Sequence, residues 1–366
     1  MTLSPLIQLC DLKVKKMETK IISITDNSGL DEVLKDAASI IRRGGLVVFP
    51  TETVYGLGAD ATNPDATSKI YVAKGRPSDN PLIVHIASPE QVVNYAFADS
   101  TYYLLAEHFM PGPLTVILPA KDTIPLTTRG GLDKVAIRCP ENKIARELIR
   151  LSDVAIAAPS ANLSGSPSPT TFEYAYLDMN GRVDMIIDGG DCDFGLESTI
   201  VKINSDGALT MLRPGKITKE DIEAIGLQVN ISDAVLEELK KDSVAESPGM
   251  KYKHYAPKAP VILLDGDKEQ IVEYINKMEA GNKSCAVIAY EEDADYISNN
   301  TEVIDVYRFG AKSDENAQAH LLFKLLRDTD KQNYSVIYAP LPKMSGIGLA
   351  LYNRMIRAAA HNIIRL

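Results

Sequence analysis

The sequence predicts an α/β (α+β) protein of two domains, and three observations support this. The chain has 366 residues, more than one hydrophobic core usually supports. From Ile21 to about Arg213, short apolar runs rich in β-branched residues alternate with helical segments, and a second such alternation begins at Val261. Between these two regions the pattern changes to an acidic helical stretch and a loop. We therefore predict two α/β domains joined by a linker.

The first alternation predicts strands separated by helices. The predicted strands are Leu46–Phe49, Leu82–Ile86, Leu114–Leu118, Val135–Arg138, Val154–Ala158, Met185–Ile187 and Thr199–Val201. Helices are expected to start at Asn63-Pro64-Asp65 and Ser88-Pro89-Glu90, where a cap residue precedes proline and an acid. Polar residues such as Thr53, His85, Arg138, Ser160 and Ser198 lie near the ends of apolar runs. Since strand ends commonly line ligand-binding crevices, we expect a single cleft.

The second alternation predicts a small C-terminal Rossmann-like α/β domain. Its predicted strands are Val261–Leu264, Ala286–Ala289 and Val336–Tyr338, and its helices are Lys268–Glu279, Asn316–Arg327 and Gly348–Ala360. No G-x-G-x-x-G follows its first strand, so dinucleotide binding is not supported there. The predicted division is an N-terminal extension (1–20), a catalytic domain (21–215), a linker (216–257) and the C-terminal domain (258–366).

Composition excludes several classes of protein. Apolar residues make up 45% of the chain and charged residues 24%, and no run approaches the roughly 18 apolar residues of a membrane helix. Residues 1–16 carry no recognisable secretory signal. The four cysteines, Cys10, Cys139, Cys192 and Cys285, are too far apart for a zinc motif or a disulfide framework, so we expect a cytoplasmic protein. A net charge of −10 argues against a large nucleic-acid-binding surface.

Two loops are candidates for anion binding. Lys74 and Arg76 lie in a loop stiffened by glycine and proline, with Asn80 further on, and offer a point charge and a planar fork to a polyphosphate or carboxylate. The segment Ala158–Pro169 follows a strand and supplies hydroxyls and N–H groups. The alternatives are a solvated pair of cations and a flexible Ser/Pro loop.

Arg138 and His85 also have structural alternatives. An arginine on an apolar strand requires an anion or several acceptors, so Arg138 either binds a ligand or forms an internal ion pair. His85 could equally be a buried structural histidine. The glycines after Tyr55 lack the Walker spacing and do not form a phosphate loop.

Several motifs, taken together and in order, resemble the YrdC/Sua family of threonylcarbamoyl-AMP synthases in its long form. They are Pro-Thr-Glu-Thr-Val-Tyr-Gly-Leu-Gly (50–58), Lys-Gly-Arg-Pro (74–77) with Asn-Pro-Leu (80–82), Pro-Gly-Pro-Leu-Thr (111–115), Ala-Pro-Ser-Ala-Asn (158–162) with Ser164-Gly165, Ser198-Thr199, Leu-Arg-Pro-Gly (212–215), and the linker motif from Ser-Pro-Gly-Met (247–250) to His-Tyr-Ala-Pro (254–257). The resemblance covers the chain from about Ile21 onward. It implies a YrdC-like twisted mixed sheet with flanking helices.

The resemblance also implies the site residues. The implied L-threonine contacts are Thr53, His85, Arg138, the backbone of Ala158, and Ser198. The implied ATP contacts are Arg76, Asn80, the backbone near Lys134, Ser160, Ser168, Arg213 and Tyr255, the last closing over the nucleotide from the linker. Lys74 and Arg76 are the implied catalytic cations, and Mg²⁺ is implied to travel on the ATP phosphates. Lys134 and Lys202 depart from the residue types expected of relatives, which puts the role of Lys134 in doubt.

The implied partners are ATP, L-threonine, bicarbonate or CO2, and a downstream threonylcarbamoyl transferase complex, with tRNA contacted indirectly. One alternative is a tRNA-binding or double-stranded-RNA-binding module without catalysis, against which the acidic net charge argues. Another is a carbamoyl-adenylate enzyme of the hydrogenase-maturation kind. The lack of Cys-x-x-Cys motifs and of another large catalytic domain argues against it.

Overall fold

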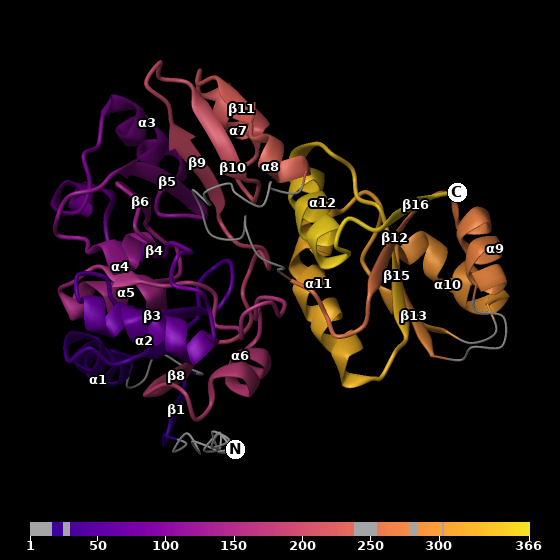
Figure 1. The fold of residues 1–366 in the computed structure, drawn as a ribbon, viewed down its shortest axis with the longest axis horizontal. Coiled ribbons are helices and arrows are strands. Elements are labelled where there is room, and N and C mark those ends of the chain that lie inside the picture. The colour runs from indigo at the N-terminus through magenta and orange to yellow at the C-terminus, as the bar shows by residue number, and fades with distance from the viewer. Residues whose placement is uncertain (1–16, 25–29, 238–254, 279–283, 302–303) are drawn as a thin grey trace, which may run out of the picture.

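The computed structural model describes residues 17–24, 30–237, 255–278, 284–301 and 304–366. Within these ranges the strands form one sheet of eleven strands and one of five, and each sheet belongs to its own domain (Figure 1). The predicted α/β class is confirmed. In the same ranges, no helix combines the length and apolar character needed to cross a membrane.

The larger sheet is mixed, as the resemblance implied. Its order is β1-β8-β2-β3-β7-β4-β6-β5-β9-β10-β11. Neighbours such as β4 and β6 run parallel, whereas β5 and β6 run antiparallel. The strand bounds are β1 Lys20–Ser23, β2 Val47–Phe49, β3 Gly56–Asp60, β4 Ile83–His85, β5 Leu114–Pro119, β6 Lys134–Arg138, β7 Ile156–Ala157, β8 Met185–Asp188, β9 Thr199–Ile203, β10 Leu209–Arg213 and β11 Val229–Ile231.

Helices cover both faces of this sheet (Figure 1). Because side chains alternate along a strand, Val47 and Phe49 of β2 pack in one apolar cluster with α1 and α5, while Val48 packs in another with α2 and α3. The helix bounds in this domain are α1 Leu30–Arg42, α2 Pro64–Lys74, η1 Pro89–Asn94, α3 Ser100–Phe109, α4 Leu126–Arg129, α5 Lys143–Ser152, α6 Phe172–Met179, α7 Lys219–Ala224 and α8 Asp233–Leu236.

Both predicted helix starts are present. The Asn63 side chain accepts hydrogen bonds from the N–H groups of Asp65 and Ala66, which caps α2 at Pro64. The helix that follows Ser88 is a six-residue 3₁₀ helix rather than an α-helix.

The predicted linker, residues 216–257, begins with ordered structure. It contains α7, β11 and α8, and β11 pairs in parallel with β10. The larger sheet therefore continues to Ile231, beyond the predicted boundary at 215. Most of the proposed closing motif lies in residues 238–254, outside the described residues, as do residues 1–16 of the predicted N-terminal extension.

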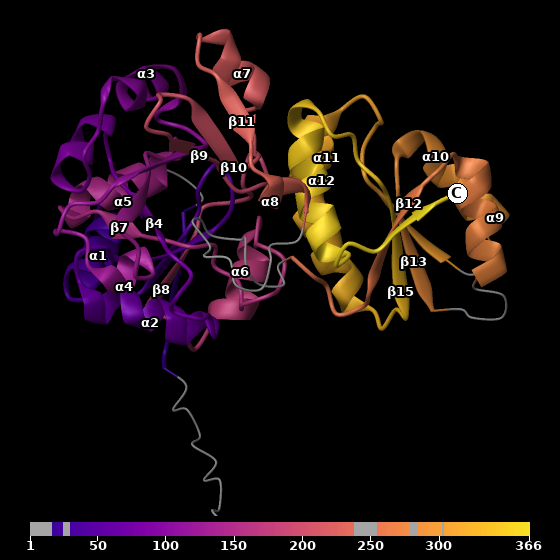
Figure 2. The same ribbon diagram turned by 45° about the horizontal axis from the view of Figure 1, so that its top comes forward.

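The C-terminal domain is a parallel sheet between two layers of helices. The strand order is β14-β13-β15-β12-β16. The helices α9 and α10 lie on the outer face, and α11 and α12 face the larger domain (Figures 1 and 2). The bounds are β12 Val261–Asp265, α9 Lys268–Met278, β13 Cys285–Ala289, α10 Glu291–Asn300, β14 Ile304–Arg308, α11 Glu315–Asp328, η2 Thr329–Lys331, β15 Val336–Pro340, α12 Gly346–Ala358 and β16 Ile363–Arg365.

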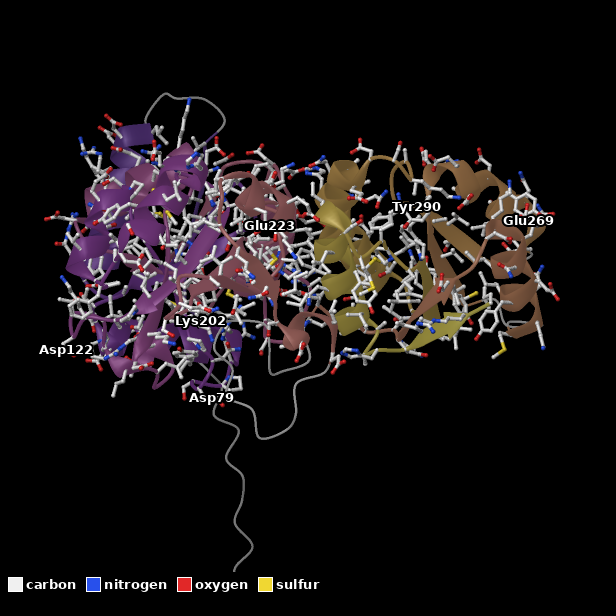
Figure 3. The ribbon with its side chains drawn as sticks, turned by 90° about the horizontal axis from the view of Figure 1, so that it is seen from above. Asp79, Asp122, Lys202, Glu223, Glu269 and Tyr290 are labelled. Carbon is white, nitrogen blue, oxygen red and sulfur yellow. The ribbon has the colours of Figure 1, made fainter. Side chains whose placement is uncertain are left out.

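The two domains share an apolar cluster, and side chains fill the space between them (Figure 3). Val54 and Leu196 of the larger domain join a cluster that contains Phe323 of α11. A buried ion pair adds to this contact, because Arg327 Nη2 lies 2.6 Å from Asp178 Oδ2 across the boundary. The C-terminal domain is thus packed against the domain that carries the predicted site residues.

Candidate active site

Strand register brings His85 and Arg138 together. The strands β4 and β6 are parallel neighbours, and His85 pairs with Arg138 at the end of both strands. The strand β7 runs antiparallel to β4 with Ile156 opposite His85, so the Ser/Pro loop leaves β7 beside Ile83, and Gly56 forms a bridge with Ser160. These loops and the His85–Arg138 pair line one cleft, which runs over the face of the sheet. The cleft expected from the sequence lies here.

Arg138 forms a buried ion pair and also lines the cleft. Its Nη2 lies 2.6 Å from Glu52 Oε1 and donates to Thr53 Oγ1 at 2.9 Å, while its Nε is buried without a hydrogen-bond partner among the described residues. Arg138 can therefore form an internal ion pair and bind a ligand at the same time. Glu52 holds one edge of the guanidinium, and Nε can donate to a bound anion.

His85 is a buried, neutral imidazole. Its Nδ1 lies 3.1 Å from the carbonyl oxygen of Ile83, so Nδ1–H is the natural donor. Burial, with the neighbouring Arg138 charge, lowers the pKa of His85 to about 3. At neutral pH this side chain can position a ligand by hydrogen bonding, but it does not supply charge.

Acidification is expected to destabilise the protein through His85. In the unfolded chain the imidazole takes up a proton near pH 6.5, whereas in the folded protein it resists protonation until about pH 3. Because the unfolded state binds one more proton in this interval, stability falls by about 1.4 kcal/mol per pH unit of acidification below pH 6.5. The free energy of unfolding, measured with urea at several pH values in this interval, should depend less steeply on pH in His85→Gln than in the native protein. Equal slopes would contradict the assignment.

Lys74 is buried at the end of α2, and its ammonium group anchors the Ser/Pro loop. Its Nζ donates to the carbonyl oxygens of Ser160 at 2.5 Å and Asn162 at 2.6 Å, and to Asn162 Oδ1 at 3.3 Å. Burial lowers its pKa, and the Arg76 charge lowers it further. Lys74 lines the cleft, but its hydrogen bonds hold the loop that carries Ser160.

Arg76 is half-buried and Asn80 is buried in the loop after α2. Arg76 Nη2 donates to the carbonyl oxygen of Pro81 at 3.0 Å, which fixes the guanidinium over its own turn. Asn80 Oδ1 is buried without a partner among the described residues. Lys134 lies away from the other predicted site residues, because it begins β6 at the opposite end of the strand from Arg138.

Arg213, at the end of β10, lines the cleft, and Ser198, just before β9, lies behind it. Arg213 donates through Nε to the Ser198 carbonyl oxygen and through Nη2 to Ser198 Oγ, both at 3.0 Å. Ser198 Oγ also lies 2.7 Å from Thr115 Oγ1. Ser198 is fully buried, and its two hydrogen bonds hold the guanidinium of Arg213 in place.

Glu197 and Tyr255 complete the cleft, and the sequence did not single out Glu197. Its Oε1 accepts a hydrogen bond from Ser168 Oγ at 2.6 Å. Tyr255 is buried and stacks on Phe323 of the C-terminal domain, with ring centres 5.1 Å apart. The Tyr255 ring is thus already packed between the domains where it lines the cleft.

The space between the atoms of the cleft amounts to about 720 Å³ when its open mouth is included. Nine of the predicted site residues line it: Lys74, Arg76, His85, Arg138, Ala158, Ser160, Ser168, Arg213 and Tyr255. Thr53 and Ser198 lie behind this lining, against the two arginines, and Asn80 and Lys134 are not part of it. The N–H of Ala158 already donates to Ile83, so a ligand contact would come from its carbonyl.

The fold and the cleft define a two-domain α/β protein with a cationic ligand site over the sheet of its larger domain. The chain belongs to the Sua5/YciO/YrdC family. The family model described as "Telomere recombination" matches residues 39–215, and the one described as "Threonylcarbamoyl-AMP synthase, C-terminal domain" matches residues 217–360. The resemblance seen in the sequence motifs is thereby confirmed.

Characterised relatives align with most of the chain. It is 42% identical over 338 residues to threonylcarbamoyl-AMP synthase of Pyrococcus abyssi, covering 91% of this chain and 96% of the relative. It is also 42% identical over 354 residues to that of Bacillus subtilis, covering 95% of this chain and 100% of the relative. The crystal structure of P. abyssi Sua5 complexed with L-threonine superposes with a TM-score of 0.87 at 39% identity, covering 96% of this chain and 100% of that chain.

Proposed function

We propose that this protein is an L-threonylcarbamoyladenylate synthase, a nucleotidyltransferase that joins L-threonine, CO2 or bicarbonate, and ATP, and releases pyrophosphate. The observation that carries the proposal is one cleft that gathers the arginines 76, 138 and 213 with buried hydroxyl groups. It lies in a chain that aligns over both domains with curated threonylcarbamoyl-AMP synthases.

L-Threonine would lie at the strand ends of β4 and β6. Its carboxylate would pair with the free edge of Arg138, whose orientation is set by Glu52 and Thr53. Neutral His85, through Nε2, and the carbonyl of Ala158 would accept hydrogen bonds from the remaining donor groups of L-threonine. In this arrangement Thr53 and Ser198 act through the arginines that they contact.

ATP would occupy the other half of the cleft. Arg76 and Arg213 would face the phosphates, and Ser160 and Ser168 would contact the nucleotide, with Tyr255 against it. Lys74 would add positive charge beside the reacting groups while it anchors the loop. Asn80 and Lys134 would contribute only through the backbone or after a shift of their loops, because neither lines the cleft.

The chemistry needs two anions in line. The neutral amino nitrogen of threonine would add to CO2 and lose a proton to water, which gives a carbamate. A carbamate oxygen would then attack the α-phosphate as the bond to the β-phosphate breaks and pyrophosphate leaves. The cationic side chains would hold the two anions against their mutual repulsion and stabilise the charge that develops on the phosphoryl oxygens.

The residues fit a magnesium ion that arrives on ATP. Among the described residues, no group of three or more histidine, cysteine or acidic side chains is placed to ligate a metal. Glu197, the one carboxylate among the described residues that line the cleft, is hydrogen-bonded to Ser168 and Arg354. The phosphates would therefore supply the protein-bound ion with its ligands, and the ion would neutralise part of their charge.

Pyrophosphate release by the purified protein is expected to require ATP, magnesium, L-threonine and bicarbonate together. Release that is indifferent to threonine would contradict the proposal. Arg76→Ala should lower turnover strongly with little loss of stability, since Arg76 is only half-buried. The control Arg150→Ala, at an exposed position, should leave turnover unchanged. Salt-sensitive tRNA binding without turnover would instead support an RNA-binding module.

The product would pass to a transferase complex that modifies tRNA, so this protein need not contact tRNA itself. We place this reaction in the cytoplasm. Cys139 and Cys192 are buried free cysteines, as is usual in a reducing compartment.

A further inference from the structure

Arg354 belongs to α12 of the C-terminal domain, but its side chain reaches the wall of the cleft in the other domain. It is completely buried, and its Nε lies 3.0 Å from Glu197 Oε2. Its Nη1 donates to the carbonyl oxygen of Pro214 at 2.7 Å, next to Arg213. Its guanidinium carbon lies 5.8 Å from the centre of the Tyr255 ring. Arg354 therefore contacts three separate segments that form one wall.

Glu197 is ionised in this setting. Burial by itself would raise its pKa, but Arg354 and Arg213 outweigh that effect and hold the pKa of Glu197 below its usual value. An ionised carboxylate has no proton to donate. The proton in the 2.6 Å contact between Glu197 and Ser168 must therefore come from the serine hydroxyl.

The direction of this hydrogen bond decides what Ser168 can bind. A hydroxyl group has one proton, and in Ser168 that proton points at Glu197. The Ser168–Glu197 pair then presents only lone pairs to the cleft, so these two side chains accept hydrogen bonds and donate none, unlike Arg213 beside them. Phosphate oxygens are acceptors too and would be repelled here. The complementary ligand group is a donor, and carboxylates beside nucleotides commonly accept from ribose hydroxyls.

We propose that Arg354 is a positioning residue that fixes Glu197 and Ser168 as an acceptor-only subsite for a hydroxyl group of the nucleotide sugar. The inference rests on the proposed function in that it takes ATP as the ligand. The C-terminal domain then contributes to nucleotide selection through one buried side chain. Arg354 does not touch the reacting atoms.

The test compares the binding of ATP, 2′-deoxyATP and 3′-deoxyATP by calorimetric titration. The native protein should bind one of the deoxynucleotides about 10-fold more weakly than ATP, which corresponds to about 1.4 kcal/mol. The ratio of the two dissociation constants should fall to about one in Arg354→Met and in Ser168→Ala. It should persist in Arg357→Met, the matched control on the same helix, whose Nη2 donates to Ala234 instead.

Equal affinity of the native protein for all three nucleotides would overturn the proposal. So would a preference for ATP that survives in Arg354→Met, because a merely structural arginine would weaken ATP and L-threonine binding without changing the preference. If Arg354→Met does not fold, the Glu197→Gln, Arg354→Met double variant removes the unpaired charge and undergoes the same titrations. A native protein that prefers ATP but releases no pyrophosphate would refute the proposed synthase activity and leave the sugar subsite standing.

Discussion

Arg138→Ala is expected to lose both stability and L-threonine binding. The substitution leaves Glu52, which is 2% exposed, as a buried charge without its partner. Breaking a buried ion pair in this way costs about 3–5 kcal/mol. Urea unfolding should show this loss, and titration should show no measurable L-threonine binding.

A double variant separates the two effects. Replacing Glu52 by Gln in the Arg138→Ala background removes the uncompensated charge, so much of the stability should return while L-threonine affinity stays low. Native-like threonine affinity in this double variant would show that Arg138 serves only the ion pair.

Lys74→Met is expected to disrupt the loop that carries Ser160, with losses in both stability and turnover. It leaves the carbonyls of Ser160 and Asn162 without the Lys74 donor, while Asn162 Oδ1 keeps its hydrogen bond from Ser160 Oγ. Each buried acceptor left unsatisfied costs about 1–3 kcal/mol. Arg76→Ala, at a half-buried position two residues away, should lower turnover with a much smaller change in the urea midpoint.

Equal stability of the Lys74→Met and native proteins would contradict this anchoring role. If turnover nevertheless collapsed, Lys74 would act mainly through its charge, as the family resemblance first implied. Comparing the urea midpoint with the turnover number for both variants therefore distinguishes an anchor from a catalytic cation.

Local patterns predicted much of the fold because they depend on neighbours in the sequence. Asn63 capped α2 as predicted, and the apolar runs at β4 and β6 ended at His85 and Arg138, which register then placed side by side. The strand β11 was missed, since its three residues, Val-Asn-Ile, lie within a predicted acidic linker and gain their strand identity by pairing with β10.

The candidate site was predictable only in part. The cations and the Ser/Pro loop stood out, but the partners that orient them lie far away along the chain. Glu52 and Arg138 are 86 residues apart, and Glu197 and Arg354 are 157 apart. Nothing in the local sequence of α12 distinguishes Arg354 from an arginine on a surface helix. Such pairings follow from tertiary packing, which periodicity does not encode.

The apolar cluster shared by the two domains has a consequence for synthesis of the chain on the ribosome. The larger domain can fold as soon as its own strands have emerged, because domains generally fold as units from the N-terminus. Since β11 ends the larger sheet at Ile231, the 123 residues from Ile231 to Arg354 (354 − 231) then take about 6–25 s to translate. Until α11 and α12 arrive, Val54, Leu196 and the Glu197 charge lie uncovered on a nascent chain, so this surface is a natural place for a chaperone to bind.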